Sequence, residues 1–134
     1  MRYFLFLMFY FFVAHGVFAS IDYPYPEETN IYLKCDKNDS HLRGSLRIAN
    51  PGMGVWLVQV WTEDENRNRY ANAYPSLMRL DPKTSRVVSI YSKQVSEENK
   101  LKWLLVSFIP SHHKDERNKL VMPISYRLKV TTGS

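Results

Sequence analysis

Downstream of residue 20, the apolar positions of the chain repeat with a period of two rather than 3.6, and polar or Pro- and Gly-containing segments interrupt them at short intervals. A period of two is typical of strands with one buried face, and closely spaced turns are typical of all-β domains. We expect seven strands, at 29–35, 42–50, 55–62, 76–80, 86–91, 101–109 and 119–130. Seven strands in a domain of this size predict an immunoglobulin-like β-sandwich rather than a closed barrel.

The segment 55–62 differs from the others because both of its faces are apolar. It reads Val-Trp-Leu-Val-Gln-Val-Trp-Thr. Strands that are covered on both faces lose the alternation of apolar and polar residues. The segment is therefore predicted to be a central strand that is buried on both sides.

The last predicted strand carries an unusually long apolar row. Six residues of one parity are apolar: Leu120, Met122, Ile124, Tyr126, Leu128 and Val130. Pro123 lies between two of them and has no N–H to donate, which indicates an edge strand. A long apolar edge is suited to pairing with another chain. The alternative is that the whole row fills the core of this domain.

The first nineteen residues have the pattern of a cleaved export signal. Arg2 precedes an apolar run over 3–14, and small residues end the segment at Ala19. A membrane anchor is the competing interpretation, but spanning requires about 20 apolar residues, and His15 interrupts the run. We expect cleavage after residue 19, no stable membrane insertion, and one domain over 20–134.

Composition and charge limit the classes of partner. A chain of 134 residues with a net charge of +5 forms one modest domain. Acidic and basic residues alternate over 63–69 and 114–117 without a basic stripe, so we expect solvated turns and no nucleic-acid binding. Cys35 is the single cysteine, which excludes an internal disulfide. Its apolar neighbours favour a buried small side chain over pairing with another chain.

Catalysis and metal binding are not indicated. His112 and His113 lie near Asp115 and Glu116, but the set lacks the spacing of a four-ligand metal site. No phosphate-binding glycine loop or nucleophile motif is present in the sequence. We expect no cofactor and no enzymatic activity.

Five segments, in this order and spacing, resemble the first domain of the periplasmic pilus chaperones of the chaperone-usher pathway. They are Ser-Leu-Arg-Ile-Ala-Asn at 45–50, Leu-Val-Gln-Val-Trp at 57–61, Pro-Ser-Leu-Met-Arg-Leu-Asp-Pro at 75–82, Trp-Leu-Leu-Val-Ser-Phe-Ile-Pro at 103–110 and Arg-Leu-Lys-Val at 127–130. The resemblance implies an immunoglobulin-like domain that works in the periplasm. It also implies that the last strand is donated to an incomplete pilin subunit during fimbrial assembly.

The resemblance assigns roles to residues of the last strand. Leu120, Met122 and Ile124 are the inserted residues, and Tyr126 and Leu128 continue the row. Lys129 takes the place of the residue that holds the C-terminal carboxylate of the subunit. The family usually pairs this lysine with an arginine, where this chain has Asn30, so the second positive charge is lacking.

The resemblance also implies partners and leaves alternatives. Pilin subunits are the expected partners, an outer-membrane usher is a further one, and the exposed edge also permits a self-dimer. The second domain of the family is not in the sequence, which stops at Ser134. The alternatives are a self-associating secreted β-sandwich with a structural or adhesive role and a truncated remnant without function.

Overall fold

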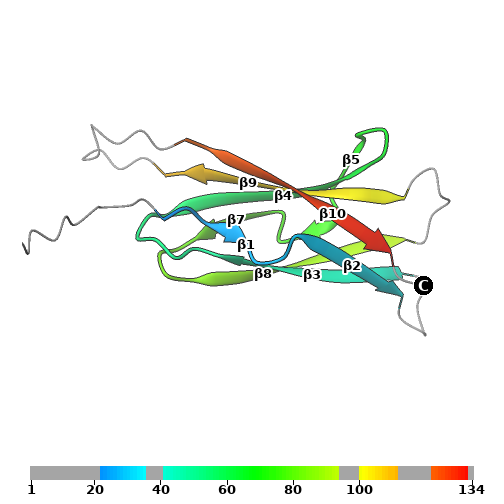
Figure 1. Cartoon of the computed structure of the whole chain (residues 1–134), viewed down its shortest axis with the longest axis horizontal. Coiled ribbons are helices and arrows are strands. Elements are labelled where there is room, and N and C mark those ends of the chain that lie inside the picture. Colours follow the sequence, from blue (N-terminus) through cyan, green and yellow to red (C-terminus); the bar gives the residue numbers. More distant parts are fainter. Residues whose placement is uncertain (1–21, 36–40, 94–99, 112–121, 133–134) are drawn as a thin grey trace, which may run out of the picture.

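The computed structural model describes residues 22–35, 41–93, 100–111 and 122–132, and its regular structure there consists of strands (Figure 1). The strands are β1 (Tyr25–Pro26), β2 (Asn30–Cys35), β3 (His41–Ala49), β4 (Trp56–Asp64), β5 (Arg69–Tyr70), β6 (Ala73–Tyr74), β7 (Leu77–Leu80), β8 (Ser85–Lys93), β9 (Leu101–Pro110) and β10 (Ile124–Thr132). In the part of the chain that is described, no helix is long and apolar enough to cross a membrane.

The strands form two layers that β2 joins at one edge. In the first layer, β3 pairs with β1 and β8, and β8 pairs with β6. In the second layer, β4 pairs with β5, β7 and β9, and β9 pairs with β10. The start of β2 pairs in parallel with the end of β10, and Lys34 and Cys35 then pair antiparallel with β3. Figure 1 shows β10 crossing from the side of β9 to the side of β2.

The core lies between the layers and follows the alternation in the sequence. The first layer buries Leu46, Ile48, Val88 and Ile90, and the second buries Val58, Val60, Leu104, Val106 and Phe108. Fully burying an aliphatic or Phe side chain contributes about 1.5–3 kcal/mol before the entropy of ordering is subtracted. The predicted all-β sandwich is confirmed.

The prediction that the segment 55–62 is covered on both faces is wrong. The strand β4 is central, but Leu57 is 39% exposed and Gln59 is also exposed, whereas Trp56, Val58 and Val60 are buried. At Leu57 and Gln59 the outer face of the second layer is open to solvent, so an apolar residue on this face does not show that a second layer covers it.

All seven predicted strands are present, with shifted ends and three added two-residue strands. The last strand is β10, which runs two residues beyond the predicted end because Thr131 and Thr132 pair with β2. Met122 and Pro123 precede it, and Leu120 lies outside the described residues, as do residues 1–21 and the two histidines at 112 and 113. The predicted burial of Cys35 is wrong, because β2 ends at this residue and leaves it exposed.

A buried asparagine holds the connection between β3 and β4. Asn50 is 2% exposed, and its Nδ2 donates to the carbonyl oxygens of Gly54 at 2.8 Å and Asp81 at 3.0 Å. Its Oδ1 accepts a hydrogen bond from the Gly52 N–H at 3.2 Å. Since a buried amide must be hydrogen-bonded on both sides, this one residue fixes the 50–54 turn against the end of β7.

Candidate functional site

The strand β10 has a half-open edge. It pairs with β9 from Ile124 to Lys129 but with β2 only from Lys129 to Thr132. The side of β10 that faces away from β9 is therefore unpaired from Ile124 to Leu128 within the described part of the chain. Pro123 indicated an edge strand, and this is correct for the first half of β10 but not for its last four residues.

The apolar row of this strand changes from exposed to buried along its length. Met122 is 59% exposed, Ile124 and Tyr126 are half-buried against the core, and Leu128 and Val130 are each 5% exposed. The two ends of the row therefore lie in different environments. Its end belongs to the core of this domain, and its beginning lies beside the open edge.

Tyr126 is held in place by an aromatic contact. Its ring meets the buried ring of Phe108 edge to face, with centroids 5.8 Å apart. On the opposite face of β10, the Ser125 and Ser107 hydroxyl groups are hydrogen-bonded at 2.8 Å. Because both faces of the strand are anchored to β9, the open edge is ordered before any partner is added.

A charged and aromatic cluster on the outer face joins β10 to β9 and β4 within the second layer. Arg127 lies 4.4 Å from the centroid of the Trp103 ring, and its Nη2 is 4.0 Å from the Glu63 carboxylate. The same carboxylate lies 3.9 Å from Arg69 Nε and accepts a hydrogen bond from Trp61 Nε1 at 3.3 Å. Sequence reasoning placed Glu63 in a solvated turn, and this is wrong because two cations and a tryptophan ring cover it.

The neighbouring Asp64 is also buried, and it organises the turn between β4 and β5. Its carboxylate accepts hydrogen bonds from the Asn68 N–H at 2.9 Å, the Asn68 side chain at 3.0 Å and the Tyr70 hydroxyl at 2.9 Å. Burial raises the pKa of Asp64, but these hydrogen bonds lower it by more, so the pKa lies below the usual 3.8. The bond to Asp64, together with burial and the negative charge, raises the pKa of Tyr70 above 10.0.

We expect Asp64→Asn to lower the free energy of unfolding at neutral pH. The pKa of Asp64 is lower in the folded chain, so its contribution is present above about pH 4 and is lost as the pH falls through the folded pKa. The difference in the free energy of unfolding between wild type and variant is therefore expected to shrink as the pH falls below about pH 4. Urea denaturation at pH 7 and at a series of pH values below 4 measures it.

Asp81→Asn is the matched control, because the Asp81 carboxylate is exposed and forms a surface ion pair with Arg79 at 2.7 Å. Exposed ion pairs contribute little to stability. The stabilising role of the ionised Asp64 would be contradicted by a loss of unfolding free energy in Asp64→Asn that does not depend on pH. A loss no larger than that in Asp81→Asn would contradict it as well.

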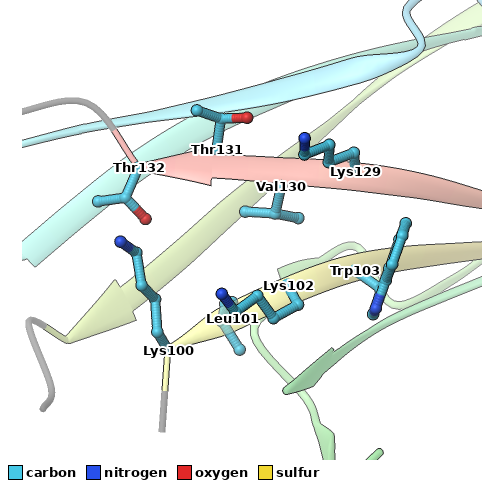
Figure 2. A pocket seen from close by; sticks show the side chains of 8 residues that line it. All are labelled: Lys100, Leu101, Lys102, Trp103, Lys129, Val130, Thr131 and Thr132. Carbon is cyan, nitrogen blue, oxygen red and sulfur yellow. The ribbon is translucent and has the colours of Figure 1, made fainter. Parts of the chain in front are cut away.

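Lys129 and Asn30, the predicted carboxylate anchor, are brought together as register partners in the pairing of β10 with β2. Both residues are exposed. Lys129 also lines a pocket of about 230 Å³ with Lys100, Lys102 and Thr132 (Figure 2). Lys100, Lys102 and Thr132 were not predicted from the sequence. The pattern of apolar positions does not show where a strand changes its pairing partner.

Within the described residues, no three His, Cys, Asp or Glu side chains form a group that could hold a metal ion. The half-open edge of β10 and the basic pocket at its end are the features that suggest binding of another molecule.

Comparison with known proteins identifies related chains. Residues 26–132 match the family model described as pili and flagellar-assembly chaperone, PapD N-terminal domain. Protein FasE of Escherichia coli is 39% identical over 108 residues, which cover 81% of this chain and 80% of that protein.

The similarity to solved structures concerns the fold. The periplasmic chaperone SfaE matches with a TM-score of 0.61 at 18% identity, over 82% of this chain and 57% of that one. The structure of the Salmonella enterica SafA pilin in complex with the SafB chaperone matches with a TM-score of 0.64 at 14% identity. The match covers 86% of this chain and 56% of that one.

The chain thus spans about half the length of the solved chaperones that it matches. The predicted immunoglobulin-like sandwich is confirmed by this likeness in fold. Because the family model covers nearly all of the described residues and FasE is 39% identical, the chain belongs to the pilus-assembly chaperones, as an N-terminal, PapD-like domain.

Proposed function

We propose that the chain binds pilin subunits by adding the open edge of β10 to the sheet of an incomplete subunit, and so caps the subunit during fimbrial assembly. The observation that carries this proposal is the unpaired edge from Ile124 to Leu128, next to an apolar row that begins with an exposed Met122. Strand addition obtains affinity from main-chain hydrogen bonds and specificity from alternate side chains.

The side chains available for insertion are those at the beginning of the row. Met122, Ile124 and Tyr126 retain exposed surface, and each contributes roughly 1.5–3 kcal/mol when buried in a groove, before ordering costs are subtracted. These costs are reduced because β9 already holds the strand. Leu128 is committed to the core of this domain, and the role of Leu120 stays a prediction.

Lys129 is proposed to face the C-terminal carboxylate of the subunit. An ammonium donates a charge-assisted hydrogen bond to a carboxylate, which is stronger than a bond between neutral groups. Asn30, its register partner, donates a hydrogen bond but supplies no charge.

We propose that the chain acts in the periplasm and that residues 1–19 are removed during export. SfaE is described as a periplasmic chaperone, and the SafA–SafB structure is a complex of a pilin with its chaperone. The first of these supports the compartment, and the second supports a pilin partner. Engagement of an outer-membrane usher stays a prediction, and we propose no catalytic chemistry.

Periplasmic co-expression with a pilin subunit from the same locus tests the proposal. Native mass spectrometry of the purified material is expected to show a one-to-one complex. A folded chain that forms only homodimers would overturn the proposal in favour of a self-associating β-sandwich. A folded monomer without any complex would also overturn it.

A further inference from the structure

Met122 is the sulfur-containing member of the apolar row of the last strand. The other members of the row carry hydrocarbon or phenol side chains. Met122 precedes Pro123 and the first residue of β10, and it is 59% exposed in the unbound chain. Figure 1 shows this start of β10 beside the end of β9. A thioether is therefore open to solvent at the place where a subunit is proposed to add.

The three methionines of the described residues differ sharply in exposure. Met53, in the turn between β3 and β4, is 77% exposed, whereas Met78 of β7 is 6% exposed and belongs to the core. Since oxidation of a sulfur by a dissolved oxidant requires contact between the two, exposure controls its rate. The folded chain therefore presents two oxidisable methionines to solvent, and of these Met122 lies in the apolar row.

We infer that Met122 is a site of reversible oxidation whose modification prevents subunit binding. The oxidant is a peroxide of the hydrogen peroxide class. The thioether sulfur takes one oxygen atom from it, so an S–O bond forms, the O–O bond breaks and water leaves; the sulfur is oxidised and the peroxide is reduced. The product, methionine sulfoxide, is polar and is returned to methionine by sulfoxide reductases. The inference rests on the proposed strand addition.

The modification acts on binding because the new oxygen is a hydrogen-bond acceptor. In the unbound chain water hydrates it, and Met122 is not part of the core, so the fold is expected to survive. In an apolar groove the same oxygen loses its hydration. Burying such an acceptor without a partner weakens binding by about tenfold to a hundredfold. A bound subunit, in turn, covers the sulfur and keeps peroxide away from it.

The rate of oxidation at each methionine is the first test. The chain is exposed to hydrogen peroxide, alone and in complex with a pilin subunit, and the added oxygen is located by peptide mass spectrometry. In the chain alone, Met53 and Met122 are expected to react before Met78. In the complex, Met122 is expected to be protected while Met53 reacts as before. Reaction of Met122 as slow as that of Met78 in the chain alone, or unprotected in the complex, contradicts the inference.

Variants assign the loss of binding to this sulfur. Met122→Leu keeps the volume and apolar character of the side chain but has no thioether, and Met53→Leu is the matched control at the other exposed methionine. All chains also carry Cys35→Ser, because the exposed Cys35 thiol is itself oxidisable. The subunit is diluted from urea into untreated or oxidised chain, and the complex is quantified by native mass spectrometry over a range of chain concentrations.

Peroxide is expected to weaken binding by about tenfold or more in the chain with both methionines and in Met53→Leu. Sulfoxide reductases are expected to restore it. Met122→Leu is expected to bind equally well before and after treatment. Thermal unfolding checks that each oxidised chain is still folded. A loss in Met122→Leu as large as in Met53→Leu would overturn the inference.

The two proposals fail in different ways. An untreated chain that binds no subunit contradicts strand addition and, with it, the inference. A chain that binds the subunit equally well before and after complete oxidation of Met122 contradicts the inference alone and leaves strand addition standing.

Discussion

Replacing Met122 and Ile124 together by aspartate is expected to abolish the complex with a pilin subunit while the chain stays folded. The two side chains begin the apolar row beside the open edge of β10, and Met122 is 59% exposed in the unbound chain. Their insertion into a groove is worth roughly 3 kcal/mol or more together, so their loss weakens binding by at least about a hundredfold. Burying two carboxylates without partners weakens it further.

The experiment is co-expression followed by native mass spectrometry, with thermal unfolding of the isolated variant as the test of folding. Ser125→Asp is the control, because it places a carboxylate directly after Ile124 but on the opposite, exposed face of the strand. We expect this control to retain the complex. A double variant that still forms the one-to-one complex would exclude insertion of this row as the source of affinity.

Phe108→Ala is expected to lower the free energy of unfolding by about 3–5 kcal/mol, a large share of the 5–15 kcal/mol typical of a folded domain. Phe108 is fully buried in β9, so its removal leaves a cavity in the core. It also removes the edge-to-face partner of Tyr126. Subunit binding is therefore expected to weaken as well, even in conditions where the variant remains folded.

Urea denaturation measures the loss of stability, and Ile109→Ala is the control on the next residue. The Ile109 side chain is 38% exposed on the outer face, so its truncation is expected to cost about 1 kcal/mol or less. Similar losses at the two positions would contradict the assignment of Phe108 to the core.

The strands could be predicted because each layer has one buried face. Leu46 with Ile48 and Val58 with Val60 alternate with exposed or half-buried residues, and this alternation is visible without any structure. Leu57 was misjudged because an apolar residue on an open face has the same pattern as one beneath a second layer. The spacing of apolar residues shows which positions are hydrophobic, but it does not show whether another part of the chain covers them.

The other differences between the predicted and the observed structure arise from contacts between residues that are distant in the sequence. The burial of Glu63 depends on Arg69 and on Arg127 of a distant strand, which no local pattern reveals. The division of the apolar row depends on β2 reaching only as far as Lys129 along β10. Lys102 and Thr132 line the same pocket because β10 changes its pairing partner beside them, and the sequence pattern does not show this change.

The division of the row has an evolutionary consequence. Leu128 and Val130 are constrained by folding, since they are buried in a core that is shared by both layers. Met122 is not part of that core, and Ile124 only borders it. Under the proposed strand addition, the preference for a pilin subunit is thus able to diverge through substitutions at the start of one strand, while the scaffold keeps its stability through residues a few positions later on the same strand.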